Sequence, residues 1–290
     1  MPSLLLALLL LLLAAPLQAA ELKLATWNIA WLTLRPATDE LLPRNLTPRQ
    51  PGDFARLADY ARRLDAHVVA LQEVDGAEAA ARVFDPREHQ FFFTRENDIQ
   101  RTGFAVRRGI TATQNEDLAA LDLAPEARFS QRRGADITIE ANGRRLRLLS
   151  IHLNAGCREG PMQASRSREC ENLLRQSEVL ARWIAERRRE GAAFAILGDF
   201  NRRMDHPRDE MSALLAAAAP LARATEGASN PCWADARGGR PFIDHILLGG
   251  PARDWLQRGS LRVMVYAERE PAFRDRLSDH CPVSVRLRLS

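Results

Sequence analysis

The segment ITIEANGRRLRLLSIHL, residues 137–153, contains two runs of strand type joined by Asn142-Gly143. Asn-Gly between two such runs is the strongest short-range signal of a β-hairpin. A long helical pattern follows from about Glu169 to Glu190, and then comes AAFAILGDF, residues 192–200, an apolar run typical of a buried strand. Hairpins occur beside helical crossovers, so the sequence predicts an α/β protein with a mixed sheet.

Outward from this segment, strands and helices alternate along the whole chain. We expect further strands at residues 21–32, 67–74, 241–248, 261–266 and 283–289, and helices from Asp53, as N-cap, to Ala66 and from about Asp209 to Ala218. No internal repeat is evident and no linker divides the chain. The stretch from Thr33 to Asp53 is rich in proline and polar residues and predicts a long loop. Long loops inside compact domains are often functional, so we expect this one to form a rim beside the site.

The N-terminus begins with an uninterrupted apolar run from Leu4 to Ala15, followed by a proline and small residues. Its length fits the apolar region of a secretory signal better than a membrane span, which needs about 20 apolar residues. The sequence therefore predicts a signal peptide at residues 1–20, cut after Ala19 or Ala20, and one catalytic domain at residues 21–290. An uncleaved anchor is the alternative. No later segment is apolar enough to span a membrane, and we expect a periplasmic or secreted protein.

The cysteine content agrees with export, and the net charge does not specify a substrate. The chain has 41 Lys and Arg against 37 Asp and Glu, a net charge of +4, which tolerates a polyanionic partner without demonstrating one. Four cysteines fit an oxidising compartment. Cys157 and Cys170 flank a loop rich in Gly, Arg and Ser and are predicted to pair. Cys281 could pair with Cys232 or be a buried free thiol.

Polar residues recur where strand-like runs end, the edge at which layered α/β folds build their sites. They are Asn28, Glu73, His152, Asn154, Asp199, Asn201, Asp244, His245, Asp279 and His280. Each alone could be a cap, a turn or a buried histidine, but their repeated occurrence indicates a site. Asp244 and His245 are adjacent on a strand, so their side chains lie on opposite faces and at most one of them faces the site.

Taken in order, the motifs WN, QE, SxH, GDFN, IDH and SDH resemble those of the endonuclease/exonuclease/phosphatase superfamily. This superfamily includes deoxyribonuclease I, abasic-site endonucleases, neutral sphingomyelinases and inositol polyphosphate 5-phosphatases. The resemblance covers essentially the whole chain after the signal and indicates an exported, bacterial-type member. It implies a four-layer α/β sandwich, with two mixed β-sheets packed face to face and helices outside, and a divalent-metal phosphodiesterase or phosphatase.

The resemblance also implies roles for these residues. Glu73, with Asn28 and Asp279, would supply the hard oxygen ligands that Mg²⁺ prefers, with Mn²⁺ or Ca²⁺ as alternatives. Asp244 would orient and charge His280, which we assign as general base. Asp199 and Asn201 would position the water and the phosphate, although members of the family differ over whether His280 or Asp199 orients the water.

His152 separates this chain from abasic-site enzymes. Within the family that the sequence resembles, those enzymes carry a tyrosine at the corresponding position. Deoxyribonuclease I, sphingomyelinases and 5-phosphatases resemble this chain in having His, and a protonated His152 could donate to a phosphate oxygen. Asn154 and the loop arginines Arg95, Arg101 and Arg133 are predicted to contact the substrate, since arginine suits bidentate phosphate contacts.

The sequence thus predicts an exported, metal-dependent phosphodiesterase, acting as a monomer, with DNA or RNA as the preferred substrate. A sphingomyelinase-like or other small phosphoester hydrolase is the alternative. An exposed apolar hairpin for membrane contact would favour the lipid substrate. The sequence has no such cluster of Trp, Phe and Leu in a loop, and Trp31 and Leu32, before the long loop, are the nearest candidates. A non-catalytic binding protein with the same fold is a third hypothesis. It is disfavoured because the metal carboxylate and the last histidine are both present.

Overall fold

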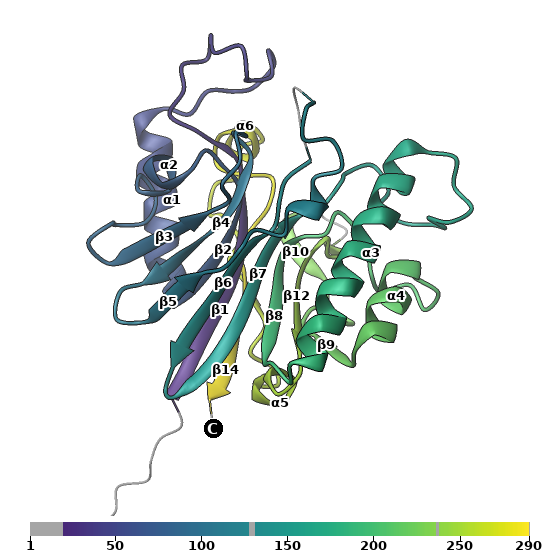
Figure 1. Cartoon of the computed structure of the whole chain (residues 1–290). Helices are drawn as coiled ribbons and strands as arrows, with labels where there is room; N and C mark the ends of the chain where they lie inside the picture. The colour runs from purple at the N-terminus through teal and green to yellow at the C-terminus, as the bar shows by residue number, and fades with distance from the viewer. Residues whose placement is uncertain (1–19, 128–130, 236–237, 290) are drawn as a thin grey trace, which may run out of the picture.

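The first of two six-stranded sheets contains both chain ends of the domain. The computed structural model describes residues 20–127, 131–235 and 238–289 (Figure 1). The sheet comprises β1 (Ala20–Leu32), β2 (Val68–Val74), β3 (His89–Phe93), β4 (Arg101–Arg107), β13 (Arg262–Val263) and β14 (Val283–Leu289). Their order is β13-β14-β1-β2-β4-β3, with β1 parallel to β2 and antiparallel to β14. The predicted signal peptide lies outside the described residues, apart from Ala20, with which β1 begins.

The second sheet is also mixed and has the order β5-β6-β7-β8-β12-β9. It comprises β5 (Thr111–Gln114), β6 (Ala135–Ala141), β7 (Arg144–His152), β8 (Phe194–Asp199), β9 (Leu221–Arg223) and β12 (Asp244–Gly249). The β6–β7 hairpin is antiparallel and β7 runs parallel to β8, as the hairpin and crossover predict. The turn residues Asn142 and Gly143 have φ values of 49° and 69°. Both are left-handed, the conformation that a two-residue hairpin turn requires.

Helices form the outer layers of the sandwich. The helices are α1 (Pro51–Leu64), α2 (Ala77–Ala80), α3 (Arg168–Arg189), α4 (Glu210–Ala218), α5 (Ala252–Trp255) and α6 (Ala272–Arg276), and a 3-10 turn covers Ala119–Leu121. The strands β10 (Asn230–Asp235) and β11 (Gly238–Arg240) form a separate two-stranded ribbon. In Figure 1, α1 and α2 lie outside the first sheet, and α3 and α4 lie outside the second. The predicted four-layer α/β sandwich is therefore confirmed.

Three apolar clusters hold these layers together. Successive side chains of β1 point to opposite faces of the sheet. Leu24 packs between the two sheets, whereas Trp27 packs on the α1 side. On the far side, Ile151 of β7 packs with Leu180 of α3. Strands buried on both faces read as nearly continuous apolar runs, which is why these segments were recognisable in the sequence.

A polar contact crosses the inner interface just below the site. Thr26 Oγ1 donates to Gln72 Oε1 (3.1 Å), and Gln72 Nε2 donates to Ser150 Oγ (3.0 Å). The Ser150 hydroxyl in turn donates to the carbonyl of Leu71 (3.0 Å). All these groups are buried and satisfied, so they fix the register of one sheet against the other. The Q of QE and the S of SxH thereby have a structural role next to Glu73 and His152.

The first helix begins earlier than the sequence predicted. It starts at Pro51 with Gln50 at the N-cap, so the assignment of Asp53 as N-cap was wrong. Proline is favoured in the first turn because that turn leaves its N–H groups unbonded. Asp53 instead accepts from the Gln50 backbone N–H (2.8 Å) and pairs with Arg276 of α6 (2.7 Å).

The strand predicted at residues 261–266 is cut to Arg262–Val263. Val263 pairs with Val283, the first residue of β14, and the Met264 N–H reaches only the carbonyl of Pro282. Before Val283, the segment that leads into β14 lies outside the sheet and contains the disulfide-bonded Cys281. A strand cannot extend past the end of its hydrogen-bonding partner, so the apolar pattern alone overestimated its length.

Both pairs of cysteines form disulfides. Cys157–Cys170 closes the loop before α3, as predicted, and Cys232–Cys281 settles the alternative for the second pair. Two disulfides favour an extracytoplasmic location. Among the described residues, none of the helices has the length and apolar character needed to cross a bilayer.

Gly198 marks the closest approach of β7 and β8. Its φ is +151°, and a Cβ there would lie 2.0 Å from the carbonyl oxygen of Ile151. We expect Gly198→Ala to lower the free energy of unfolding by about 3 kcal/mol or more, because the clash is with backbone. Gly109→Ala is the control: its φ is +94° with nothing within 4 Å of the new Cβ. It should cost about 1 kcal/mol, and equal losses in urea titrations would rule out the clash.

Candidate active site

The predicted site residues meet at one end of the sandwich. His152 ends β7 and Asp199 ends β8, and these two residues are partners in the parallel register. Asp244 is opposite Asp199 in the antiparallel register, although it is the first residue of β12. Asp279 and His280 likewise precede β14. The expectation of carboxyl strand ends therefore holds for β7 and β8, whereas β12 and β14 bring their starts to the same edge because they run the opposite way.

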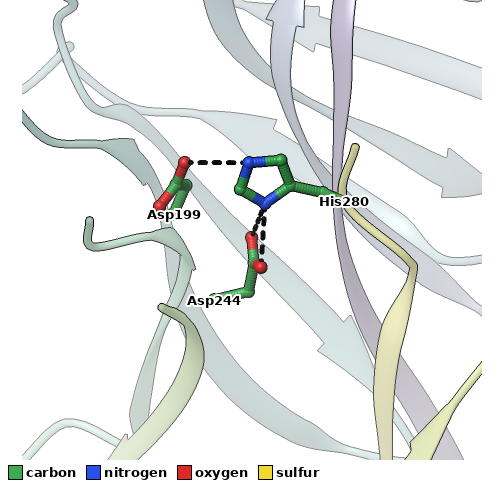
Figure 2. A group of neighbouring side chains, drawn as sticks. All are labelled: Asp199, Asp244 and His280. Atoms are coloured by element: carbon green, nitrogen blue, oxygen red, sulfur yellow. Dashed lines mark hydrogen bonds and ion pairs between the residues drawn. The ribbon is translucent and has the colours of Figure 1, made fainter. Parts of the chain in front are cut away.

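His280 is held between two carboxylates (Figure 2). Its Nδ1 lies 2.9 Å from each carboxylate oxygen of Asp244, and its Nε2 lies 3.6 Å from Asp199 Oδ2. Its backbone is also fixed: the N–H donates to Ser278 Oγ (3.0 Å), and the carbonyl accepts from the Tyr266 hydroxyl (2.9 Å). The imidazole therefore presents Nε2 toward Asp199 with Nδ1 committed to Asp244.

Burial and charge set the protonation of this group. Burial alone would lower the pKa of His280, but the charges of Asp244 and Asp199 raise it well above its ordinary value. Burial raises the pKa of Asp199 to about 7, against the opposing effect of the His280 charge. At neutral pH the site therefore holds an imidazolium beside a carboxylate that is ready to take a proton.

His152 is buried and faces the same centre. Its Nε2 lies 3.7 Å from Glu73 Oε1 and 3.7 Å from Asp199 Oδ2. Burial, the Arg132 charge and the His280 charge lower the pKa of His152 well below its ordinary value. The neutral imidazole, rather than the protonated form considered from the sequence, is thus favoured here, and it can donate through only one ring nitrogen.

Glu73 is held by three donors. Asn28 Nδ2 donates to Oε1 (2.9 Å), while the Trp31 N–H (3.2 Å) and Gln100 Nε2 (2.6 Å) donate to Oε2. The Asn28 side-chain oxygen accepts from the Ala30 N–H (2.9 Å). In this arrangement Asn28 orients Glu73 through its nitrogen, and its role as an oxygen ligand stays a prediction.

Backbone strain is concentrated around Glu73. The residues Ala30, Trp31, Glu73 and Asn201 have φ values of 38°, 56°, 58° and 51°. Side chains other than glycine rarely adopt such angles, and where they persist the surrounding structure enforces them, often at functional sites. The strain at Trp31 aims its N–H at Glu73. It also coincides with a shift in the β1–β2 register between Asn28 and Leu32.

A cavity of about 560 Å³ opens beside Glu73 and Asp279, and the loop from Thr33 to Gln50 supplies part of its wall. This confirms the expected rim loop. Two carboxylates on one cavity, one of them partly buried and held by three hydrogen bonds, fit a hard divalent cation. The group Asp199, Asp244 and His280 is also close enough to hold an ion. Because Asp244 and His280 already neutralise each other, Glu73 and Asp279 suit the cation better.

Asn201 lies at the centre of the candidate active site, and Asn154 lies at the edge of the site. The Asn201 N–H donates to Asp199 Oδ1 (2.8 Å), and its side-chain amide donates to the Leu153 carbonyl (3.0 Å). The Asn154 side chain donates to the Ala155 carbonyl (2.6 Å) and accepts from Gln131 Nε2 (2.7 Å). Asn154 is thus committed to loop contacts, and its predicted role in substrate binding stays a prediction.

The loop arginines lie on two sides. Arg133 donates to the Arg95 carbonyl (3.3 Å) and lies 3.9 Å from Glu96 Oε2, so the loops that carry Arg95 and Arg133 are in contact. Arg101 lies 3.8 Å from Asp75 and lines a separate cavity that includes neither Glu73 nor Asp279. The structure thus keeps Arg95 and Arg133 together but separates Arg101 from them.

Sequence reasoning did not assign Gln100 or Ser278 to the site, and it noted Arg132 only as a loop arginine beside Arg133. Gln100 bonds Glu73, Arg132 acts on His152, and Ser278 bonds both the Asn28 carbonyl (2.7 Å) and the His280 N–H. Ser278 could have been found, because it belongs to the SDH motif. Gln100 stands in a loop without a pattern, so only the folded chain shows its contact with Glu73.

His245 points away from the site, as strand alternation predicts. It is buried, with its ring nitrogens 2.6 Å from Thr225 Oγ1 and 2.9 Å from the Arg202 carbonyl, and burial lowers its pKa to about 4. The unfolded chain protonates this group near pH 6.5, so stability should fall by about 3 kcal/mol as the pH falls from about 6.5 to 4. His245→Gln should lack this component in urea titrations. An identical pH dependence in both proteins would contradict the assignment.

The fold and this site define a metal-dependent phosphoester hydrolase. The chain belongs to the Endonuclease/Exonuclease/phosphatase family, whose sequence profile matches residues 25–280. A comparison with curated protein sequences gives no significant match.

Solved structures share the fold at low identity. TDP2 from C. elegans is 16% identical with a TM-score of 0.59, over 95% of this chain and 77% of that one. A humanized D. rerio TDP2 is 18% identical with a TM-score of 0.57, over 92% and 98%. A mannosyl-6-phosphatase from Bacteroides thetaiotaomicron is 14% identical with a TM-score of 0.57, over 91% and 98%.

Proposed function

We propose that the protein is an exported, divalent-metal-dependent phosphodiesterase that cleaves DNA or RNA by water attack and acts as a monomer in the periplasm or outside the cell. The observation that carries the chemistry is the His280 pair with Asp244, set against a second buried carboxylate, Asp199. Phosphoester hydrolysis needs a proton acceptor for water and donors for the charge on phosphate oxygens. This group supplies both.

The protonation of the site favours a division of roles different from the sequence prediction, in which His280 is the base. Asp199, with a pKa of about 7, accepts the proton of the attacking water. His280 carries a proton and donates from Nε2 to a phosphate oxygen, and the neutral His152 adds a second donor. Asn201 fixes Asp199 through its backbone N–H.

Mg²⁺, bound by Glu73 and Asp279, would polarise a phosphoryl oxygen and stabilise charge on the leaving oxygen. Mn²⁺ and Ca²⁺ are the alternatives. Glu73 is positioned for this role by Asn28, Trp31 and Gln100, so its carboxylate needs little rearrangement.

The loop arginines support a nucleic acid substrate. Arg132 is close enough to His152 to lower the pKa of that histidine, and Arg133, next to it in the chain, bonds the carbonyl of Arg95. Guanidinium groups beside a phosphate centre suit further phosphates along a strand. One of the structural relatives, D. rerio TDP2, was solved with a single-strand DNA product, which agrees with this proposal.

The cavity beside Glu73 favours a second candidate, hydrolysis of a small phosphoester. Its wall includes Trp31, Asn45 and Thr47, and among the described residues Arg274 is the one guanidinium that lines it, with Asp275 beside it. Such a lining suits an uncharged substituent better than a second phosphate. The structural relative that is a mannosyl-6-phosphatase agrees with this alternative.

A substrate panel separates the two candidates. Purified protein lacking residues 1–20 would be assayed with Mg²⁺ or EDTA on single-stranded DNA, plasmid, RNA, sphingomyelin, sugar 6-phosphates and bis-p-nitrophenyl phosphate. For a nuclease, the double variant Arg95→Gln, Arg133→Gln should raise KM for DNA and reduce its salt dependence, while hydrolysis of the small diester changes little. Cleavage of sugar phosphate or sphingomyelin alone would sink the nuclease proposal and support the second candidate.

A further inference from the structure

Arg49, in the last part of the rim loop, bonds four backbone carbonyls at once. Its Nη1 donates to Trp31 O (2.9 Å), and its Nη2 donates to Ile29 O (2.6 Å), Ala30 O (2.8 Å) and Leu277 O (2.7 Å). Burial lowers the pKa of Arg49 to about 10, so the side chain remains charged at neutral pH. A guanidinium offers five donors in a rigid fork and can therefore join groups from several segments.

Three of these carbonyls belong to the strained end of β1. Ala30 and Trp31 have left-handed φ values, and the amides of this segment point at the site: the Ala30 N–H to Asn28 and the Trp31 N–H to Glu73. With the amides turned inward, the carbonyls of residues 29–31 are bound by Arg49. Arg49 thus stabilises the backbone conformation that delivers a hydrogen bond to Glu73.

The fourth carbonyl belongs to the segment that carries His280. Leu277 is followed by Ser278, whose hydroxyl donates to the Asn28 carbonyl (2.7 Å) and accepts the His280 N–H (3.0 Å). Arg49 therefore joins the backbone beneath Glu73 to the backbone beneath Asp279 and His280. These segments are more than 200 positions apart in the sequence, with Arg49 and Leu277 separated by 228.

We propose that Arg49 is a positioning residue of the site, which holds the Glu73 and His280 segments in one geometry without touching the substrate. Loss of this link leaves Glu73 with a weaker Trp31 hydrogen bond and lets the Asp279 loop move independently. Groups that orient a metal carboxylate typically change metal affinity or activity by about 10–100-fold when removed. The inference rests on the proposed function for its Mg²⁺ and activity measurements, whereas the exchange measurement described below is independent of it.

The test uses Arg49→Lys, which keeps the charge but replaces the planar fork with a single ammonium, and Arg49→Met. Arg35→Met is the matched control, because Arg35 lies in the same loop and bonds Asp39 and Asp75 at the surface. We expect both Arg49 variants to weaken Mg²⁺ binding by about 10-fold or more in calorimetry and to lower kcat similarly, with Arg35→Met unchanged.

Amide hydrogen exchange without metal gives a second measurement that needs no substrate. In Arg49→Lys, exchange should rise at Trp31 and His280, while the β6–β7 hairpin keeps its protection. Unchanged exchange at Trp31 and His280, or exchange that rises equally everywhere with a matching loss of the thermal midpoint, would overturn the proposal. So would failure of both variants to fold, since Arg49 would then be structural. Local exchange that rises while Mg²⁺ affinity stays unchanged would place the cation away from Glu73 and count against the proposed function. If the local exchange and Mg²⁺ effects appear but no phosphoester is cleaved, only the proposed function fails.

Discussion

Asp199→Asn should lower kcat/KM by about 10³-fold or more with the fold intact, because a positioned general base commonly contributes about 10²–10⁴-fold and Asp199 also fixes His280. Burial raises the pKa of this carboxyl to about 7, so its charged form is disfavoured inside the protein. An uncharged amide of the same shape should therefore leave the thermal midpoint unchanged or raise it. In the wild type, kcat/KM should increase as the pH rises through about 7, where Asp199 loses its proton.

Asp209→Asn is the matched control for this measurement. Asp209 is a buried carboxylate that pairs with the Arg202 guanidinium (2.6 Å) and caps α4 by accepting from the Ser212 N–H (2.8 Å). Its replacement should destabilise the protein, since it leaves a buried guanidinium without its counter-charge, while kcat/KM of the folded fraction is kept. The opposite result, a stability loss in Asp199→Asn with activity retained, would make Asp199 a structural residue.

Glu73→Gln is expected to lower activity roughly 10³-fold at moderate Mg²⁺, because a metal that stabilises transition-state charge contributes several kcal/mol. The amide preserves the shape of the side chain but removes the charge that binds the cation. Mg²⁺ should raise the thermal midpoint of the wild type, since a ligand that binds only the folded state stabilises it, and this rise should be absent in Glu73→Gln.

Glu210→Gln is the corresponding control. Glu210, like Glu73, is a carboxylate held by hydrogen bonds, here from the backbone N–H groups of Met162 (2.6 Å) and Gln163 (2.9 Å), but it lies in α4. The Glu210→Gln protein should retain both activity and the Mg²⁺-dependent rise of the thermal midpoint. A Glu73→Gln protein that still binds Mg²⁺ with wild-type affinity would place the cation elsewhere, with Asp199, Asp244 and His280 as the next group to test.

The parts of the fold that could be predicted are those that local sequence patterns determine. The Asn142-Gly143 hairpin, α3 and β14 each follow from residues that are neighbours in sequence, and the structure confirms them. The same reasoning failed at the 261–266 strand, because the length of a strand depends on a partner that lies elsewhere in the chain. It also misplaced the start of α1, because the helix begins at Pro51 with Gln50 as its N-cap, before Asp53.

The sequence by itself determined the family motifs and their order, the fold class, and which residue types gather at the site. Only the tertiary structure decided that Cys232 pairs with Cys281, 49 positions away, and that Arg49 joins the Glu73 and His280 segments. It also decided the protonation of Asp199 and His280. These features depend on burial and on contacts between distant segments, and neither quantity has a local signature in the amino-acid sequence.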